Sequence, residues 1–563
     1  MDLAAELKRI VKGEVVDDEA TLTKYSTDAS IFRIKPRVVV FPRDVEDIKE
    51  VVKFVALRKK DDPTLSITVR SGGTDMSGGA LTESIVLDVN KYLNRMKEVV
   101  EDPVGGGEAG YAVVEPGMYY RDFEKETLKK GLIMPSYPAS REICTVGGMV
   151  ANNAGGEKTL TYGKTEDYVR EVKMILRDGN EYVFRPLEKS ELKEKMAVNS
   201  VEGEVYNKLF NLIDTNYEIL KSAKPKVSKN SAGYFLWNVL NKEKEIFDIP
   251  KVIVGSQGTF GVITEITFAL VHPKKHSALL IIFIKNIKDL GHVVKKVLEH
   301  TPESFESYDD HTAKIALRYL PDMIKLLGAR SLFRLGIQFI PEFFMVLTGG
   351  VPKLFLIAEF TGDSEEEIYK KAYAARADLA EFKLKTRVAR GETQKESDLE
   401  EKKYWTVRRE SFNLLRHHVH GKRTAPFIDD IVVRPETLPE FLPRLNDIMD
   451  DYKLIYTIAG HVGDGNFHII PLMKLSESGV GKEIAELSRK VYALVIEFGG
   501  SITAEHNDGL VRSPFLKQMY GEKVYGLFEE TKKIFDPDNI FNPGKKVNSD
   551  FEYALKHLAS ELS

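Results

Sequence analysis

Cysteine is almost absent from this chain, since Cys144 is the only one among 563 residues. A single thiol cannot form a disulfide within the chain, and it cannot supply the thiolates of an iron–sulfur cluster or a zinc finger. Such a composition is typical of a reducing compartment, so we expect a cytoplasmic protein. Residues 1–9 contain charges where a secretory signal needs an apolar run, and no such signal is expected.

The chain also lacks an excess of either charge and a long apolar run. Its 81 basic and 85 acidic residues leave a net charge of −4, so we expect no nucleic-acid partner. No window reaches the roughly 18 uncharged apolar residues of a membrane span. Residues 320–347 come nearest, and charged residues interrupt them. We interpret this segment as a buried helical pair or a surface that docks a partner subunit, in preference to a peripheral contact with the inner face of the membrane.

The length of the chain predicts two or three domains. From about residue 36, β-rich runs alternate with amphipathic helices, beginning with residues 37–41 and a helix capped by Asp44. This alternation predicts the α+β class. The expected parts are a helical lead-in over residues 1–35, a first domain over 36–272, a second α+β domain over 273–500, and a returning C-terminal segment over 501–563.

The most informative stretch runs from His461 to His468 and is followed by Glu505 and His506. Asp464-Gly465 lies between two β-rich runs and predicts a two-residue hairpin turn. Such a turn places His461 directly opposite His468, with Cβ atoms roughly 5 Å apart on one face. These imidazoles and Glu505 make three protein ligands, an arrangement typical of a catalytic metal site, with His506 beside it as a candidate base. Taken singly, each is more often an ordinary polar side chain.

Three glycine-rich stretches lie in the first half of the chain, at residues 70–79, 144–156 and 255–264. Consecutive glycines allow backbone N–H groups to converge on an anion such as a pyrophosphate. The first stretch has neither the Gly-x-Gly-x-x-Gly of dinucleotide folds nor a Walker A pattern, which argues against a simple NAD or ATP site.

Taken in this order, the glycine stretches and the histidine hairpin resemble the FAD-linked oxidases of the vanillyl-alcohol-oxidase superfamily. The resemblance is to the branch of D-lactate dehydrogenases, D-2-hydroxyglutarate dehydrogenases and the flavin subunit of glycolate oxidase, and it extends from about residue 25 to 546. It implies a flavoprotein oxidoreductase with a PCMH-type FAD-binding domain and an α+β substrate (cap) domain.

The resemblance also implies which residues contact FAD. They lie in the glycine stretches, in the residues before the second stretch, and in the Asn542-Pro-Gly-Lys segment that returns to the cofactor. The expected FAD-binding residues are Arg70, Ser71, Gly72, Gly73, Thr74, Ser77, Pro138, Ser140, Thr145, Gly147, Gly148, Asn152, Gly155, Gly258, Ile263 and Asn542.

The resemblance assigns His461, His468 and Glu505 to a divalent metal, expected to be zinc, and His506 to the catalytic base. Arg408, in a Trp-x-x-Arg element, corresponds to the arginine that binds the substrate carboxylate. From the residues alone, a surface ion pair with Glu410 or another acidic residue is the preferred interpretation of Arg408.

The implied reaction is the oxidation of a D-2-hydroxy acid, such as D-lactate, glycolate or D-2-hydroxyglutarate, to the 2-keto acid. The metal polarises the substrate hydroxyl so that an imidazole can take its proton, and a hydride passes to flavin N5. We expect the electrons to leave to a partner, which is an iron–sulfur subunit, an electron-transfer flavoprotein or a quinone.

Several positions depart from the pattern of the family. Ser71 and Asp75 replace the usual glycine and serine of the first loop, and a carboxylate beside a pyrophosphate is unfavourable unless it points away. Glu505-His-Asn-Asp-Gly is most similar to the branch fused to an iron–sulfur module. A lysine expected just before the Phe427–Asp430 region is replaced by an apolar residue. The substrate is therefore not fixed.

Two other questions stay open at the level of the sequence. Cys144 is adjacent to a Thr-Val-Gly, out of register by one with relatives that bind flavin through cysteine, and a free buried thiol is the preferred interpretation. The rival functions are a non-redox flavoenzyme like alkylglycerone-phosphate synthase and a non-catalytic FAD-binding subunit. The intact set of His461, His468, Glu505 and His506 disfavours both.

Overall fold

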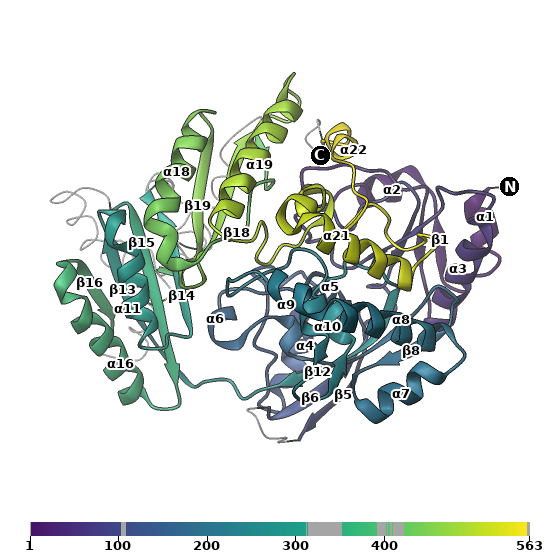
Figure 1. The fold of residues 1–563 in the computed structure, drawn as a ribbon, viewed down its shortest axis with the longest axis horizontal. Coiled ribbons are helices and arrows are strands. Elements are labelled where there is room, and N and C mark those ends of the chain that lie inside the picture. Colours follow the sequence, from purple (N-terminus) through teal and green to yellow (C-terminus); the bar gives the residue numbers. More distant parts are fainter. Residues whose placement is uncertain are drawn as a thin grey trace.

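The computed structural model describes residues 2–102, 108–310, 352–390 and 422–559, together with residues 312, 401, 404, 405 and 408. Figure 1 shows two parts: the first half of the chain together with the C-terminal helices, and a large sheet with the helices that cover it. The mixed helix and sheet content confirms the α+β class. The segment 320–347 lies outside the described residues. Among the helices that are described, none is long and apolar enough to cross a membrane.

The N-terminal part begins with a four-stranded sheet in the order β1-β2-β4-β3. Strands β2 and β3 run parallel to β4, and β1 pairs with β2 in the antiparallel sense. The side chain of Asp44 caps helix α3 by accepting a hydrogen bond from the N–H of Asp47, as its position before an amphipathic run predicts. The elements are β1 (Glu14–Val16), β2 (Val38–Phe41), α3 (Val45–Arg58), β3 (Ile67–Arg70) and β4 (Ile85–Asp88).

The sequence predicted a helical lead-in over residues 1–35, but the structure contains a strand there as well as helices. Helices α1 (Leu3–Leu7) and α2 (Glu19–Tyr25) flank the strand β1, which extends the edge of the first sheet. The short run Glu14-Val-Val has too few residues to show a period, so its pairing with β2 decides its structure.

A second, antiparallel sheet of five strands follows in the order β5-β6-β12-β7-β8. Its buried cluster includes side chains from several helices, among them α5, α8 and α21, so helix α21 near the C-terminus completes the core of the first half. Figure 1 shows this yellow helix lying over the blue ones. The elements are β5 (Met96–Glu101), β6 (Gly110–Val114), β7 (Val169–Ile175), β8 (Glu181–Phe184), β12 (Val262–Leu270), α5 (Val146–Asn152), α8 (Val201–Thr215) and α21 (Leu516–Phe535).

The third large sheet, here called the cap sheet, has the order β16-β13-β15-β14-β19-β20-β17, with β18 paired to β20. All its strand pairs are antiparallel. The strands are β13 (His276–Ile284), β14 (Ser304–Asp309), β15 (Leu354–Gly362), β16 (Lys385–Ala389), β17 (Arg423–Thr424), β18 (Ile431–Val432), β19 (Ile455–His461) and β20 (Asn466–Met473).

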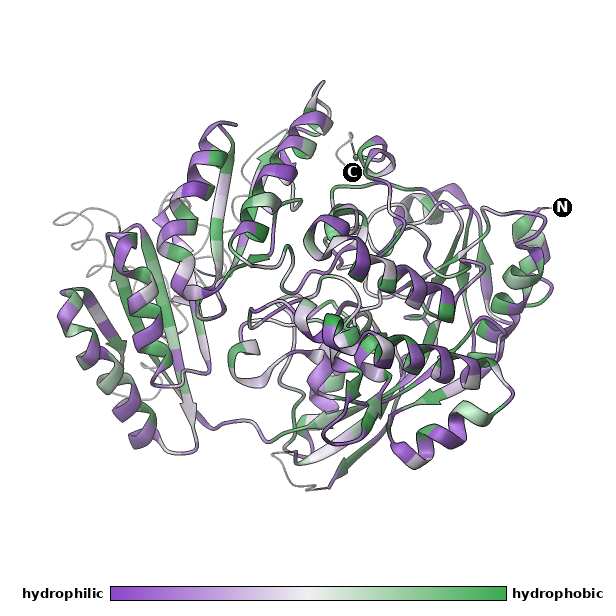
Figure 2. Cartoon of the chain, viewed as in Figure 1, coloured by the Kyte–Doolittle hydropathy of each residue, from purple (hydrophilic) through white to green (hydrophobic). Residues whose placement is uncertain are grey.

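Four helices cover one face of the cap sheet: α11 (Leu290–Leu298), α16 (Glu365–Asp378), α18 (Leu438–Asp450) and α19 (Val480–Glu497). Figure 2 shows the green, apolar strands beneath helices that carry purple, polar residues. The alternate side chains of the strands point to the opposite face, here called the site face. Buried apolar residues on it include Ile281, Tyr308, Ile357 and Trp405.

The histidine hairpin forms, but its register differs from the predicted one by two residues. Ala459 pairs with His468, and His461 pairs with Asn466. The turn is not the dipeptide Asp464-Gly465, because a 3₁₀ turn over Val462–Asp464 precedes Gly465 at φ 70°. The longer loop shifts the pairing by an even number of residues, so His461 and His468 still point to the same face.

Candidate functional site

The strands β19 and β20 and the loop after α19 bring the four predicted residues together. The ring centroids of His461 and His468 lie 5.2 Å apart, and those of His468 and His506 lie 5.0 Å apart in a stack. Nε2 of His461 is 3.4 Å from Oε1 of Glu505. The tightest group of possible ligand atoms, all within 4.8 Å of one another, comprises Asp430, His468, Glu505 and His506.

A carboxylate holds Nδ1 of each imidazole. Asp429 contacts Nδ1 of His468 through Oδ1 at 3.2 Å and Nδ1 of His506 through Oδ2 at 2.5 Å. Glu306 on β14 contacts Nδ1 of His461 at 2.5 Å. In each ring this leaves Nε2 as the nitrogen that can bind a metal or take a proton.

Asp430 shapes the backbone of the Glu505 segment rather than offering a free ligand. Its Oδ2 accepts hydrogen bonds from the hydroxyl of Thr503 and from the N–H groups of Ala504, Glu505 and His506, at 2.7–2.9 Å. Its Oδ1 accepts from the side-chain amide of Asn466. Because these donors occupy both oxygens, we assign Asp430 to positioning and retain His461 as the neighbour of Glu505.

The carboxylate of Glu505 has a buried cation beside it. Nζ of Lys229 lies 2.6 Å from Oε1 of Glu505 and 3.1 Å from Oδ2 of Asp464 in the hairpin turn. Burial opposes the charged form, but the two carboxylates outweigh it and raise the pKa of Lys229 above its ordinary value. The side chain is therefore a buried ammonium with two anionic partners.

Charges at the site also outweigh the effect of burial on the imidazoles. Burial alone would lower the pKa of His506, but Asp429 and Asp430 raise that pKa to about 9. In the same way, Glu306 overcomes burial and raises the pKa of His461 to about 9. Burial disfavours ionised Glu505, yet Lys229 and His461 hold its pKa well below the usual range. Without a metal, His461 and His506 are therefore protonated at neutral pH beside an ionised Glu505.

Arg408 lies at the same end of the site face. Its Nη2 is 3.1 Å from Oε2 of Glu306, whose other oxygen holds His461. The side chain of Arg408 is only 15% exposed, so the pair is not the surface ion pair that we weighed as the alternative. Nε of Arg408 is buried and has no hydrogen-bond partner among the described residues, so within this part of the chain the guanidinium retains a donor for another group.

The first two glycine stretches pack directly against each other. The hydroxyls of Ser71 and Thr145 are in contact. A β-carbon at Gly72 would lie 2.6 Å from the carbonyl oxygen of Ile143, and one at Gly148 would lie 3.0 Å from Oγ of Ser71. Only glycine allows so close an approach at position 72. In the third stretch, Gly258 has φ +67° and open space where a β-carbon would be, which leaves room beside the loop.

Asn542, near the end of the chain, contacts both the first and the third glycine stretch. Its side-chain amide donates to the carbonyl oxygens of Gly79 and Gln257, at 2.8 and 2.7 Å. Its Oδ1 accepts from the hydroxyl of Thr68 at 3.0 Å. The C-terminal segment therefore returns to the glycine loops, at the place where the resemblance expects FAD.

The glycine stretches also reach the histidine site. The side-chain amide of Asn152 donates to the carbonyl oxygen of Glu505 at 2.9 Å. A β-carbon at Gly155 would lie 3.4 Å from Oε1 of Glu505. The predicted flavin-binding stretch and the predicted metal ligand are thus in contact, although about 350 residues separate them in the chain.

Three residues of the first loop face the protein. The guanidinium of Arg70 donates to the carbonyl oxygens of Tyr25 and Thr27. Ser77 is fully buried and lies beside Gln257. The carboxylate of Asp75 turns back into its own loop, where it accepts hydrogen bonds from the N–H of Gly79 at 2.6 Å and from Ser77. Asp75 departs from the serine that is usual in the family, and the loop accommodates it because its carboxylate points into the loop.

Other predicted FAD-binding residues keep part of their surface exposed along these stretches. They are Gly73, Thr74, Pro138, Ser140 and Ile263, whereas Gly147 is buried. The thiol of Cys144 is buried, and burial raises its pKa to about 12. A thiol with so high a pKa is a poor nucleophile, which favours a free cysteine.

The sequence did not single out Glu306, Asp429, Asp430 or Lys229 as site residues. One usable signal was the acidic residues at 306 and 309 in an otherwise strand-like run, and another was the pair Asp429-Asp430 among apolar residues. Lys229 gave no signal, because its carboxylate partners Asp464 and Glu505 are distant in the chain, the second by 276 residues.

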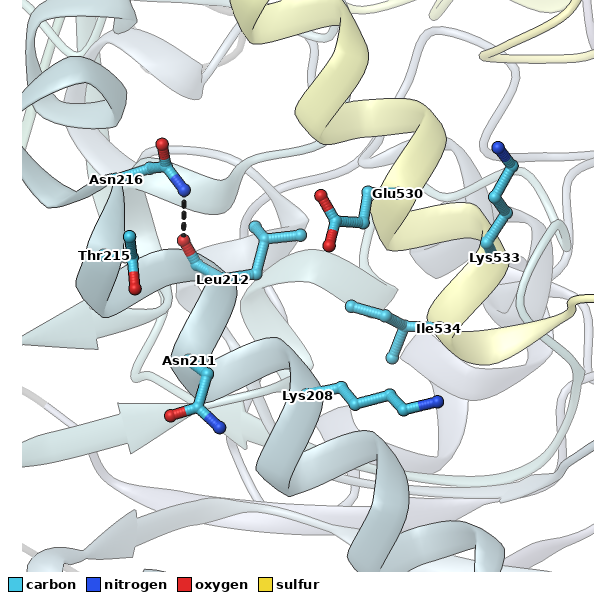
Figure 3. Close-up of a pocket in the computed structure, with 8 residues that line it drawn as sticks. All are labelled: Lys208, Asn211, Leu212, Thr215, Asn216, Glu530, Lys533 and Ile534. Atoms are coloured by element: carbon cyan, nitrogen blue, oxygen red, sulfur yellow. Dashed lines mark hydrogen bonds between the residues drawn. The ribbon is translucent and has the colours of Figure 1, made fainter.

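An open surface pocket of about 530 Å³ lies between α8 and α21, with Leu212 and Ile534 beside Lys208 and Lys533 (Figure 3). Asn216 closes one end by donating to the carbonyl oxygen of Leu212 at 2.9 Å. None of the residues that line this pocket belongs to the histidine site or to the glycine stretches.

Comparison with known families agrees with this geometry. Residues 36–184 match an FAD binding domain, and residues 273–546 match the C-terminal domain of FAD linked oxidases. The chain is therefore a flavoprotein with the two domains of an FAD-dependent oxidoreductase. It belongs to the family of FAD-linked oxidases, and its cofactor is FAD.

Curated relatives with similar sequences are named as dehydrogenases and oxidases. The chain is 27% identical to a D-2-hydroxyglutarate dehydrogenase of Pseudomonas putida over 95% of its own length and 50% of the relative's. It is 27% identical to a D-lactate dehydrogenase of Anaerostipes hadrus, over 96% and 94% of the two chains. It is 24% identical to glycolate oxidase subunit GlcD of Bacillus subtilis, over 100% and 99%. The chain spans about half the length of the Pseudomonas relative.

Solved structures share the fold at low sequence identity. A 4-ethylphenol oxidase from Gulosibacter chungangensis superposes with a TM-score of 0.65 at 16% identity, over 98% of this chain and 97% of that one. An alkyldihydroxyacetonephosphate synthase superposes with a TM-score of 0.63 at 14% identity, over 96% and 84%. At these identities the likeness supports the fold and says nothing about the reaction.

Proposed function

We propose that this protein is an FAD-dependent dehydrogenase that oxidises a D-2-hydroxy acid to the 2-keto acid. The observation that carries the proposal is the contact between Glu505, in the histidine site, and the glycine stretch at Asn152 and Gly155. A substrate hydroxyl at the histidines would then lie beside the flavin. The names of the relatives support the substrate class, which is that of D-lactate, glycolate and D-2-hydroxyglutarate.

His461, His468 and Glu505 would hold a divalent metal ion, for which zinc fits the set of two imidazoles and one carboxylate. Their fit rests on the two occupied Nδ1 atoms of His461 and His468, since metal-binding histidines commonly donate Nδ1–H to a carboxylate or carbonyl. When bound, the ion supplies Lewis acidity to the substrate hydroxyl.

We assign proton abstraction to Nε2 of His506. Asp429 holds the opposite nitrogen of the ring at 2.5 Å and so fixes its orientation. A raised pKa of about 9 in the metal-free site would keep the ring protonated at neutral pH. A second positive charge beside His506 lowers that pKa, because like charges disfavour a further proton. A bound metal would therefore favour the neutral form of His506, which can accept a proton.

Arg408 would bind the carboxylate of the substrate. The guanidinium is held by Glu306 and still has an unpartnered buried donor at Nε. A two-point contact with a carboxylate fixes which face of the substrate Cα is presented to the flavin. Glu306 would thus position both the carboxylate-binding group and the metal ligand His461.

FAD, when bound by the glycine stretches and Asn542, supplies the two-electron acceptor of the reaction. We propose that the electrons then leave to an iron–sulfur subunit, an electron-transfer flavoprotein or a quinone. The proposed division remains an FAD-binding domain over 36–272, a cap domain over 273–500 and a returning segment over 501–563. A cytoplasmic location, or a peripheral one through residues 320–347, is part of the same proposal.

A dye-linked assay tests the substrate class. The FAD-reconstituted protein is assayed with D- and L-lactate, glycolate, and D- and L-2-hydroxyglutarate, with and without added zinc. We expect one acid to be oxidised at least about tenfold faster than the others, with the D enantiomer preferred wherever the acid is chiral. Absence of dye reduction with every acid would instead favour the non-redox flavoenzyme or the non-catalytic subunit.

A further inference from the structure

Lys229 is a buried charged group at the histidine site that the proposed reaction does not use. It belongs to the first half of the chain, and none of its surface is exposed. Its ammonium has three acceptors: Glu505 at 2.6 Å, Asp464 at 3.1 Å and the carbonyl oxygen of Gly156 at 3.3 Å. An ammonium has three N–H donors, so every donor of this lysine is used inside the site.

These acceptors come from separate parts of the molecule. Gly156 ends the second glycine stretch, Asp464 lies in the turn of the histidine hairpin, and Glu505 lies in the loop after α19. A neighbouring lysine, Lys164, binds the same loop without touching a carboxylate, since it donates to the carbonyl oxygen of Ala504 at 2.7 Å. Lys164 can hold the backbone, so holding the loop in place does not by itself require a cation on Glu505.

We infer that Lys229 sets the charge of the metal site: its ammonium pairs with the carboxylate of Glu505 that would hold the metal, and so would weaken the binding of the ion and keep it electrophilic. The inference rests on the proposed function, because it needs a metal at Glu505. Any ion bound by Glu505 would lie within about 6 Å of the ammonium, since both contact one carboxylate.

Two opposite effects of removing Lys229 have to be weighed. Loss of an orienting contact to a metal ligand typically weakens metal affinity by about 10–100-fold. Loss of a positive charge roughly 6 Å from a divalent ion strengthens the metal affinity. In a buried site of effective dielectric constant about 20, this Coulomb effect is larger than the effect of the lost contact. The charge effect therefore decides the sign, and the variant K229M should bind the ion more tightly.

The substitution D464N gives a prediction of the opposite sign. It removes the second anion of the ammonium and leaves Lys229 fully charged beside Glu505. The charge account predicts weaker metal binding in D464N and stronger binding in K229M. A purely structural role for the lysine predicts weaker binding in both, because either change removes a buried contact.

The test is the dissociation constant of Zn²⁺, measured by competition with a chromogenic chelator on FAD-loaded protein at about pH 8, where carboxylates are ionised. We expect K229M to bind zinc at least about tenfold more tightly than the wild type, D464N at least about threefold more weakly, and K229R as the wild type does. The matched control is K532M, which breaks another buried lysine–carboxylate pair (Lys532–Asp536, 2.5 Å) and should leave zinc affinity unchanged.

Equal or weaker zinc binding by K229M overturns the inference while leaving the proposed function intact. Failure of the wild-type protein to bind zinc or any other divalent ion overturns both. If K229M does not fold, D464N is compared with the double variant K229M/D464N. The charge account requires the double variant to bind zinc more tightly than D464N, and the reverse order refutes it.

Discussion

The carboxylate of Asp429 and the imidazole of His506 meet at 2.5 Å, between Oδ2 and Nδ1. The other oxygen of the same carboxylate lies 3.2 Å from Nδ1 of His468. Although burial opposes ionisation of Asp429, the two imidazoles hold its pKa well below the usual range. One buried anion therefore orients both the proposed base and a proposed metal ligand, and links the two roles.

Replacing Asp429 with asparagine should impair both roles. The amide can donate a hydrogen bond to Nδ1 and so favour the tautomer with the proton on Nε2, where neither a metal nor a proton can be accepted. We expect zinc affinity to fall by about 10–100-fold, and the rate of flavin reduction by at least as much. D536N, which alters a buried carboxylate paired with Lys532, is the control and should keep both properties. Unchanged zinc affinity in D429N would contradict this assignment.

The role of Arg408 is tested by separating binding from turnover. In R408M the guanidinium that Glu306 holds is lost, so the substrate carboxylate loses its proposed partner. We expect KM for the hydroxy acid to rise at least about tenfold, with FAD and zinc contents unchanged. The wild type should use the uncharged amide of the same acid less efficiently than the acid itself, whereas the variant should not distinguish the two. A KM that does not move would return Arg408 to a structural ion pair.

The affinity for FAD should depend on Asn542. Its amide ties Gly79 in the first glycine stretch to Gln257 in the third, so N542A leaves two buried carbonyl groups without a donor. We expect the dissociation constant of FAD, from the fluorescence of the released flavin, to rise by about tenfold or more. The thermal midpoint of the FAD-free protein should change little by comparison. Equal FAD affinity in N542A and the wild type would show that the loops are held by other contacts.

The state of Cys144 determines whether FAD can be attached covalently through this residue. Its thiol is buried, with a pKa raised to about 12 by burial, so little thiolate is present at neutral pH. Acid precipitation should therefore release all the flavin into the supernatant, and C144A should retain a full complement of FAD. Flavin that stays with the precipitated wild-type protein and is lost in C144A would show the cysteinyl link instead.

The carboxyl of Glu359, on β15, should make the folding stability of the protein depend on pH. Burial, then the nearby charge of Glu303, raises the pKa of Glu359 to about 8. The folded state thus prefers the protonated carboxyl, so this contribution to stability is complete below the unfolded pKa of about 4.5 and is lost as the pH rises through about 8.

The substitution E359Q should remove that loss. The thermal midpoints of variant and wild type should agree near pH 5 and diverge with rising pH, with the variant the more stable at pH 9. The exposed pair of Lys274 and Asp363 provides a control in D363N, which should follow the wild type at each pH. A constant difference between E359Q and the wild type would show that Glu359 is ionised throughout.

Local signals predicted much of the fold. Ser364 accepts a hydrogen bond from the N–H of Glu367 at the start of α16, as a serine before an acidic first turn predicts. The apolar, β-rich runs at 279–284 and 354–360 form most of the adjacent strands β13 and β15. In both cases the information lies within one element.

The histidine hairpin marks the limit of such reasoning. The sequence predicts which residues share a face, because the two-residue period of a strand survives an even shift of register. It did not predict the 3₁₀ turn over Val462–Asp464. Both the predicted two-residue turn and the observed longer turn contain Asp464-Gly465, so this dipeptide does not distinguish them. The predicted direct pairing of His461 with His468 was therefore wrong, while their common face is confirmed.

Partners distant in the chain were not predictable in the same way. Glu306 is 155 residues from His461, Asp429 is 77 from His506, and Lys229 is 276 from Glu505. Glu306 meets His461 because β14 and β19 are neighbouring strands of the cap sheet. Lys229 meets Glu505 only where the first half of the chain packs against the loop after α19. The sequence predicted the proposed ligands and the proposed base, and the structure shows the groups that position them.

The most direct test of the account is the visible absorption of the FAD-loaded protein, mixed anaerobically with the preferred hydroxy acid. The account predicts that the flavin band disappears within one turnover, that a chelator which removes the metal abolishes the reaction, and that added Zn²⁺ restores it. The isosteric change H506N should slow the same step by at least about 100-fold. Rapid bleaching that neither the chelator nor H506N affects would contradict the proposed metal-assisted removal of the hydroxyl proton.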